Sequence, residues 1–426
     1  MKQLGMIFLM GYALSGGVAH AATYYVSRSG SDASSCAQAT NSSAPKQTLK
    51  AALPCLAAGD TLYVRGGTYP ESLENPPVAS GTSWSNKVRI AAYPGETVWL
   101  ASPATNFAIL FDINQSYIEI DGINVDGRNA LLGVVVIGFH NPFPAQPHHI
   151  RIQNAEILNV PGGVGSYAKN GIELAAKTPI VTGGIELRYL KIHGNGRPGS
   201  ANSDNGYGIY VAAPNTLVEY SDIYDNKGCE MQIYNDDGAI PDNNIIRNNV
   251  FHDQTRLGAG PGGCGILIAG SGNQIYNNVF YNIRPGPSDG VSIYGYVGNA
   301  NKIWNNTSYN NTGGIQLAGG MSNTEVRNNI AYSNGFDWSN AGSATVQSNN
   351  LFGVNPLFAN AGAGDFHLQS SSPARNTGLT IASVTTDMIG TMRPQEGIAD
   401  IGAIEFQGSV STPAAPTAPT GLRILY

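Results

Sequence analysis

Four stretches of the chain repeat one short pattern: an apolar residue, a variable residue and two asparagines. They read Ile246-Arg247-Asn248-Asn249, Ile275-Tyr276-Asn277-Asn278, Ile303-Trp304-Asn305-Asn306 and Val326-Arg327-Asn328-Asn329. Related copies begin at Val218 and Val346, and degenerate earlier copies begin at Ile120, Ile152 and Leu187. From Val218 onward the copies are spaced 28, 29, 28, 23 and 20 residues apart. Repetition at such a period is typical of a protein whose units stack along one axis.

A second pattern within each repeat is a short alternating segment, usually led by glycine. Its apolar pairs are Ile172/Leu174, Ile209/Val211, Met231/Ile233, Ile266/Ile268, Val291/Ile293 and Ile315/Leu317. Successive side chains of a strand point to opposite faces, so the residue between each pair should point outward. The expected outward row is Glu173, Tyr210, Gln232, Leu267, Ser292 and Gln316.

Two short strands and one asparagine-rich turn per repeat predict an all-β parallel solenoid. A propeller blade would need about 40–50 residues. In a solenoid, equivalent strands pair about 4.8 Å apart, and equivalent asparagines can stack as a ladder of amide hydrogen bonds. That ladder satisfies turn backbone that would otherwise be buried unpaired, so we interpret the paired asparagines as structural.

The four cysteines test this alignment. Cys229 lies two residues before Met231, and Cys264 lies two residues before Ile266. Both therefore occupy the same position of neighbouring coils, at a separation that suits a disulfide. We predict a Cys229–Cys264 bond and, by elimination, a Cys36–Cys55 bond.

Residues 1–21 have the features of a secretory signal peptide, with Lys2 before an apolar stretch and an Ala-His-Ala site ending at Ala21. No apolar run is long enough to span a bilayer. We therefore expect a secreted or periplasmic protein without a membrane span. The net charge of −6 argues against a nucleic-acid partner, and we expect a monomer.

The remaining chain divides into four predicted parts. Residues 22–87 form an N-terminal cap and the first strands, and Leu49, Ala52, Leu53 and Leu56 lie on one face of a short capping helix. Residues 88–352 form the repeat region. Residues 353–407 lose the repeat and are expected to cover the last coil as an irregular C-terminal cap, and residues 408–426 are a tail rich in Pro, Thr and Ala.

Both ends of the mature chain resemble secreted right-handed parallel β-helix proteins of the pectate-lyase-like superfamily. The resemblance lies in ATYYVSRSGSD and KQTLKAALPCLAAGDTLYVRGGTY near the start, and in NPLFANAGAGDFHLQSSSPARNTG and MRPQEGIADIGAIEF near the end. It implies a right-handed parallel β-helix that acts on polysaccharide. The superfamily includes lyases, hydrolases, epimerases and proteins of unknown activity, so the resemblance specifies the fold more than the reaction.

Three long loops should leave one corner of the solenoid, at about residues 193–206, 252–263 and 282–289. Insertions that gather on one face often line a binding site. Ionisable residues concentrate there, and nearby tyrosines offer flat faces that suit stacking on sugars. The expected substrate-binding residues are Glu173, Tyr207, Tyr210, Glu230, Gln232, Tyr234, Asp289 and Tyr294.

A polysaccharide lyase that acts on a uronate needs a base and a positive charge beside the sugar carboxylate. We expect Lys227 or His252 as the base, and Arg256 and Arg284 as the charge partners. Calcium held by Asp204, Asp236 or Asp237 could supply that charge instead.

Two alternatives remain open. Asn235-Asp236-Asp237-Gly238 resembles the paired-aspartate motif of polygalacturonase-like hydrolases, which use two carboxyl groups, but the companion motifs of that family are missing. A non-catalytic glycan-binding or surface-structural protein is the other alternative, because no complete catalytic signature is present.

Overall fold

The computed structural model describes residues 21–138, 146–160, 170–175, 183–196, 206–234, 238, 240–254, 263–285 and 290–408. Residues 1–20 of the predicted signal peptide and the tail beyond Gly408 lie outside these residues. Within the described ranges, no helix is long and apolar enough to cross a membrane.

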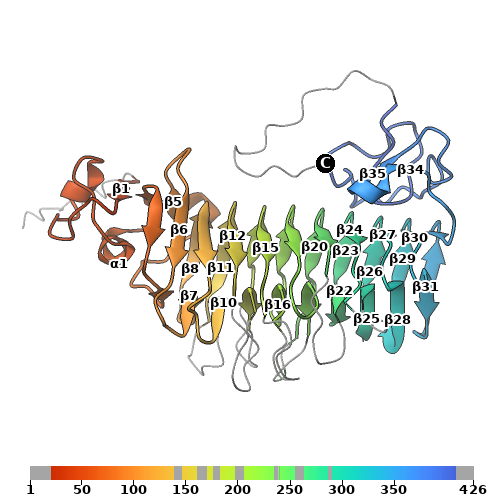
Figure 1. Ribbon diagram of the computed structural model, residues 1–426, viewed down its shortest axis with the longest axis horizontal. Coiled ribbons are helices and arrows are strands. Elements are labelled where there is room, and N and C mark those ends of the chain that lie inside the picture. The colour runs from red at the N-terminus through yellow and green to blue at the C-terminus, as the bar shows by residue number, and fades with distance from the viewer. Residues whose placement is uncertain are drawn as a thin grey trace, which may run out of the picture.

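The repeat region is a parallel β-helix built from three long sheets, which run along the molecule in Figure 1. Sheet A pairs β1 (Thr23–Val26), β2 (Thr61–Val64), β5 (Val88–Ala92), β8 (Ser116–Asp121), β11 (His148–Gln153), β14 (Glu186–Arg188), β17 (Leu217–Glu219), β20 (Ile245–Arg247), β23 (Gln274–Tyr276), β26 (Lys302–Trp304), β29 (Glu325–Arg327) and β32 (Val346–Ser348).

Sheets B and C complete each coil. Sheet B pairs β3 (Gly67–Tyr69), β6 (Val98–Ala101), β9 (Ile123–Asp126), β12 (Glu156–Leu158), β15 (Lys191–His193), β18 (Asp222–Tyr224), β21 (Val250–His252), β24 (Val279–Tyr281), β27 (Thr307–Tyr309), β30 (Ile330–Tyr332) and β33 (Leu351–Phe352). Sheet C pairs β4 (Leu73–Glu74), β7 (Phe107–Phe111), β10 (Gly133–Ile137), β13 (Ile172–Leu174), β16 (Ile209–Val211), β19 (Met231–Ile233), β22 (Cys264–Ala269), β25 (Val291–Asn299), β28 (Gly313–Ser322) and β31 (Trp338–Asn340).

The predicted stacking of sheet A is confirmed. Val218 pairs with Ile246, Ile246 with Ile275, Ile275 with Ile303, and Ile303 with Val326. All five side chains are buried, so one file of apolar residues runs through the core. The predicted alignment of the last copy is wrong by one residue. Val326 pairs with Gln347 and not with Val346, which is 48% exposed.

The expectation of two strands per repeat was wrong, because sheet B supplies a third. Its strands from β12 to β30 are three residues long, and each buries its central residue, such as Phe251 and Phe280. A three-residue strand with one inward side chain is too short to show alternation in the sequence.

Asparagines at the corner between sheets A and B form the predicted ladder. The Asn278 side chain donates to the Ile246 carbonyl and to Asn306 Oδ1, and the Asn249 N–H donates to Asn278 Oδ1. The preceding asparagine of each turn has a left-handed backbone, with φ of 57° at Asn248 and 54° at Asn277. Asparagine tolerates that conformation, which explains why each turn uses two asparagines.

Both predicted disulfides are present. Cys229 and Cys264 occupy one position of neighbouring coils, with Cα atoms 4.3 Å apart. The Cys36–Cys55 bond joins the segment after β1 to the end of η2 (Leu53–Cys55). Two disulfides are consistent with an oxidising compartment.

The N-terminal end is covered by α1 (Leu49–Ala52) and η2, whose residues Leu49, Ala52 and Leu53, with the following Leu56, are buried as expected. The other short 3₁₀ helices are η1 (Gln38–Thr40), η3 (Trp84–Asn86) and η4 (Ala361–Ala363).

The C-terminal segment, residues 353–407, was expected over the last coil but lies along the flank of the β-helix (Figure 1). It includes the antiparallel pair β34 (Phe358–Asn360) and β35 (Asp365–Leu368). Phe366 and Ile404 pack on Val279 of sheet B, and Val384 packs on Trp304 of sheet A. The segment therefore covers the corner between these two sheets and leaves sheet C on the other side.

Candidate functional site

The outer face of sheet C carries one row of side chains in register. Glu173 pairs with Tyr210, Tyr210 with Gln232, Gln232 with Leu267, Leu267 with Tyr294, and Tyr294 with Gln316. This agrees with the predicted outward row at every position except Ser292.

Ser292 is buried, and its Oγ donates to the Gly314 carbonyl at 2.6 Å and contacts Ser308 Oγ. It lies where the chain turns into sheet C, so its direction follows the corner and not the alternation of a strand. Tyr294 takes its place in the outward row.

Tyrosines are the main feature of this face. The Tyr207 and Tyr210 rings lie 5.7 Å apart, and the Tyr296 ring lies 6.3 Å from Tyr234 and 6.2 Å from Tyr294. Tyr296 is 44% exposed. Such rings offer a flat apolar surface with polar hydroxyls at its edge, which suits the face of a sugar ring.

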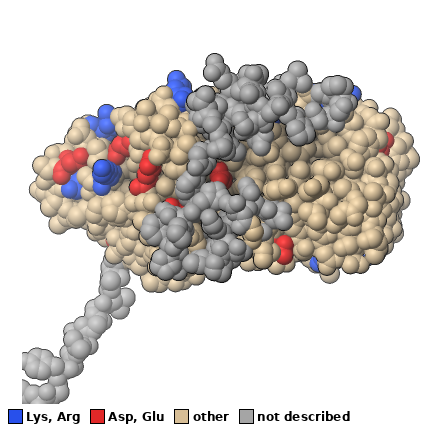
Figure 2. Space-filling model, turned by 90° about the horizontal axis from the view of Figure 1, so that it is seen from below, with Lys and Arg blue, Asp and Glu red and all other residues tan. Residues whose placement is uncertain are grey.

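Polar groups lie beside the tyrosines. Asn170 Nδ2 donates to Glu173 Oε2 at 3.2 Å, and Asn170 Oδ1 accepts from the Tyr207 N–H. Gln232 belongs to the same row but is nearly buried. The described C-terminal half of the surface seen from below carries few charged residues, whereas charges gather toward the N-terminal end (Figure 2). Sugar hydroxyls are neutral, so a tyrosine-rich, weakly charged face suits their binding.

Lys227 and Arg284 lie at the corner between sheets B and C, at equivalent positions two coils apart, or about 10 Å along the axis. Lys227 is 4% exposed, and its Cβ packs on Gly196 and Gly206. Arg284 is exposed and donates from Nη1 to Asn310 Oδ1 at 2.6 Å. Both therefore border sheet C.

His252 lies on the outer face of sheet B, at the end of β21. Its ring stacks between Tyr224 at 4.8 Å and Tyr281 at 5.0 Å, and Tyr224 stacks on His193. Nε2 lies 2.7 Å from Asp222 Oδ1, and Nδ1 lies 2.9 Å from Asp253 Oδ2.

Burial lowers the pKa of His252, but the hydrogen bonds to Asp222 and Asp253 outweigh it and raise that pKa to about 9. An imidazolium whose two N–H groups point at carboxylates has no lone pair to accept a proton. His252 therefore does not fit the expected role of base. The stack was not predicted from the sequence, although its rings share one position in successive coils.

Glu230 was expected on the binding face but lies inside the β-helix, with no exposed surface. Asn226 donates to it from both Nδ2 and its backbone N–H. Burial raises the pKa of this carboxyl to about 8, although the hydrogen bonds from Asn226 act in the opposite direction. Glu230 cannot contact a polysaccharide on the outside.

The comparisons with known proteins agree on the fold. A family model described as the right-handed beta helix region matches residues 108–284. Pectate lyase L of Paenibacillus polymyxa (strain SC2) is 26% identical in an alignment of 328 residues that covers 70% of this chain and 64% of that protein. The chain thus spans slightly less than two thirds of the length of this relative.

Two solved lyase structures superimpose on the chain. Pectate lyase Pel9A gives a TM-score of 0.58 at 15% identity and covers 92% of this chain and 98% of its own. The chain therefore has the fold of a right-handed parallel β-helix, which it shares with pectate lyase Pel9A. A rhamnogalacturonan lyase gives a TM-score of 0.51 at 15% identity over 87% of this β-helix protein and 99% of its own chain.

Several predicted site residues of the β-helix protein lie outside the described residues: Asp204, Asp236, Asp237, Arg256 and Asp289. Among the residues that are described, no group of three His, Cys, Asp or Glu side chains could hold a metal ion. The calcium prediction therefore rests on the three aspartates alone.

Proposed function

We propose that the protein is a secreted polysaccharide lyase that cleaves a uronate-containing glycan by β-elimination on the outer face of sheet C. The observation that carries the proposal is the tyrosine surface of Tyr210, Tyr234, Tyr294 and Tyr296. The named lyases that resemble the chain support the choice of reaction.

In this reaction a base removes the proton beside the uronate carboxylate, a carbon–carbon double bond forms, and the glycosidic oxygen leaves with its electron pair and gains a proton. Cationic groups beside the carboxylate stabilise the negative charge that develops. Lys227 is the proposed base, and Arg284 and Arg256 are the proposed charge partners. Because Lys227 is nearly buried, the substrate would have to approach it at the edge of sheet C.

The test is to incubate the mature protein with pectate, alginate, rhamnogalacturonan and glycosaminoglycans, and to record the absorbance of the new double bond. Lys227→Gln and Arg284→Gln should lower the rate at least tenfold. Lys302→Gln is the matched control, because Lys302 lies over Trp304 on sheet A. Parallel reactions with calcium and with a chelator test the predicted metal.

The two alternative functions would give different products. A hydrolase would release ends without a double bond, and a glycan-binding protein would retain polysaccharide without cleaving it. Either result, on a substrate that the protein demonstrably binds, would contradict the lyase proposal.

A further inference from the structure

At the corner between sheets A and B, a row of asparagines with left-handed backbone conformation binds the C-terminal segment through hydrogen bonds. Nδ2 of Asn277 donates to the Thr386 carbonyl at 2.7 Å, Nδ2 of Asn328 to the Leu379 carbonyl at 2.8 Å, and Nδ2 of Asn349 to the Thr377 carbonyl at 2.8 Å. Asn305 contacts the carbonyls of Asp400 and Gly402 in the same way. Four consecutive coils thus use this position to bind the segment.

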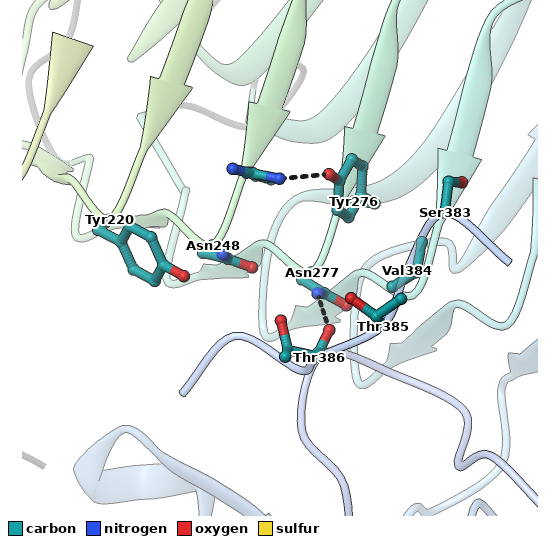
Figure 3. Close-up of a pocket in the computed structure, with 9 residues that line it drawn as sticks. Tyr220, Asn248, Tyr276, Asn277, Ser383, Val384, Thr385 and Thr386 are labelled. Carbon is teal, nitrogen blue, oxygen red and sulfur yellow. Dashed lines mark hydrogen bonds between the residues drawn. The ribbon is translucent and has the colours of Figure 1, made fainter. Parts of the chain in front are cut away.

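Asn248 is the next member of the row and differs from the others. It is buried, and its Oδ1 has no hydrogen-bond partner. It lines a pocket of about 110 Å³ together with Tyr220, Arg247 and Tyr276 from the coils and Val384 and Thr386 from the C-terminal segment (Figure 3). A buried acceptor without a hydrogen-bond donor lowers the stability of the fold. A ligand that donates a hydrogen bond in this pocket would remove that cost.

A series of ion pairs runs along the outer face of sheet A, and its last member, Arg247, lines the same pocket. We call this series the charge ladder. Arg89 and Arg151 bind Glu119, Arg151 and Arg188 bind Glu186, and Arg188 and Arg247 bind Glu219. The ladder ends at Arg247, which is paired with Glu219 and also donates from Nη1 to the Tyr276 hydroxyl at 3.0 Å. The Tyr276 hydroxyl accepts that bond and keeps its own proton to donate.

These groups indicate the chemistry of a ligand that would fit the pocket. A ligand should place an anionic oxygen beside Arg247 and the Tyr276 hydroxyl, and a hydroxyl donor beside Asn248 Oδ1. A uronate carries a carboxylate and ring hydroxyls on one small ring. At about 110 Å³ the pocket is smaller than the 300–1,000 Å³ typical of drug-sized sites, so it suits one sugar unit.

We propose that this pocket binds a single uronate unit of a polysaccharide, on the side of the β-helix away from sheet C. Only the choice of uronate rests on the proposed lyase function. The site would hold a second part of the polymer while sheet C acts on another, which would raise the effective concentration of substrate.

The test is calorimetric titration of the mature protein with galacturonate, glucuronate and mannuronate, with neutral galactose as the ligand control. Tyr276→Phe and Tyr220→Phe keep the ring shapes and remove the hydroxyls. Tyr189→Phe is the matched protein control, because its ring stacks on Tyr220 at 5.0 Å without lining the pocket. Tyr294→Ala reports binding on sheet C instead.

We expect at least one uronate to bind, galactose to bind at least tenfold more weakly, and Tyr276→Phe to weaken uronate binding about tenfold. Tyr189→Phe should bind as the wild type does. Asn248→Gly, which keeps the left-handed backbone, should also weaken binding, and thermal unfolding confirms that each variant is folded.

The proposal is overturned if no uronate binds, if galactose binds equally well, or if only Tyr294→Ala lowers the affinity. These outcomes are independent of catalysis, because a monosaccharide has no glycosidic bond for the lyase to cleave. Loss of uronate binding with intact lyase activity on a polymer would refute this site alone, and the reverse result would refute the lyase proposal alone.

Discussion

His252 Nε2 and Asp222 Oδ1 lie 2.7 Å apart across neighbouring strands of sheet B. Asp253 contacts the other ring nitrogen, and the pKa of His252 reaches about 9. Because this pKa is higher than in the unfolded chain, the charged histidine stabilises the fold in full below pH about 6.5. That contribution is lost as the pH rises through about 9.

His252→Gln should therefore lower the free energy of unfolding by about 2–3 kcal/mol at pH 6 and by much less at pH 10. Urea unfolding at both pH values measures this difference. His193→Gln, which removes a ring with one carboxylate partner, is the control and should cost less. A direct NMR titration of His252 with a midpoint at or below pH 6.5 would contradict the assignment.

Glu230 has a linkage of the same sign, because its pKa is also raised in the folded state. Burial raises its pKa to about 8, so the folded state binds a proton that the unfolded state releases above pH about 4.5. Stability should decrease as the pH rises from about 4.5 to 8. At pH 8, the free energy of unfolding of Glu230→Gln should exceed that of the wild type by about 2 kcal/mol in urea unfolding. The difference should vanish near pH 4. The exposed-side control is Glu325→Gln, and equal pH profiles of wild type and Glu230→Gln would refute this account.

The two disulfides should differ in their contributions. Cys229–Cys264 closes a separation of 35 residues, and Cys36–Cys55 closes 19. Chain-entropy arguments give about 3.8 and 3.2 kcal/mol, respectively. Replacing each pair by alanine and measuring urea unfolding should rank Cys229–Cys264 first, and an inverted order would show that native-state effects dominate.

The asparagine ladder predicts a large effect from one buried amide. Asn278→Ala would leave the Asn249 N–H and the Ile246 carbonyl without their partner, at a cost of about 3 kcal/mol. Gln274→Ala, in the outward position of the same coil, should cost under 1 kcal/mol. Similar losses for both variants in urea unfolding would mean that the ladder adds little.

The sequence predicted the features that repeat with a regular spacing. The stacked file from Val218 to Val326, the asparagine ladder and the Cys229–Cys264 bond all follow from one alignment of the repeats. Sheet B escaped notice because its strands show one inward residue each. The Val346 copy was misaligned because Gln347, a polar residue, takes the position that isoleucine or valine occupies elsewhere.

Site residues were harder to predict at the corners of the coil. Ser292 and Glu230 both point inward because the chain bends there, and strand alternation does not hold across a bend. His252 looked like a base from its residue type, but the carboxylates that hold it come from an earlier coil and from its own neighbour. Such partners become visible only when the coils are superimposed.

The central claim is that polysaccharide lies along the outer face of sheet C, and a crystal structure with a bound uronate oligosaccharide tests it most directly. We predict sugar rings over Tyr234, Tyr294 and Tyr296, with a carboxylate near the corner that holds Lys227 and Arg284. An oligosaccharide that instead lies across the outer face of sheet B, with the sheet C tyrosines untouched, would contradict the account.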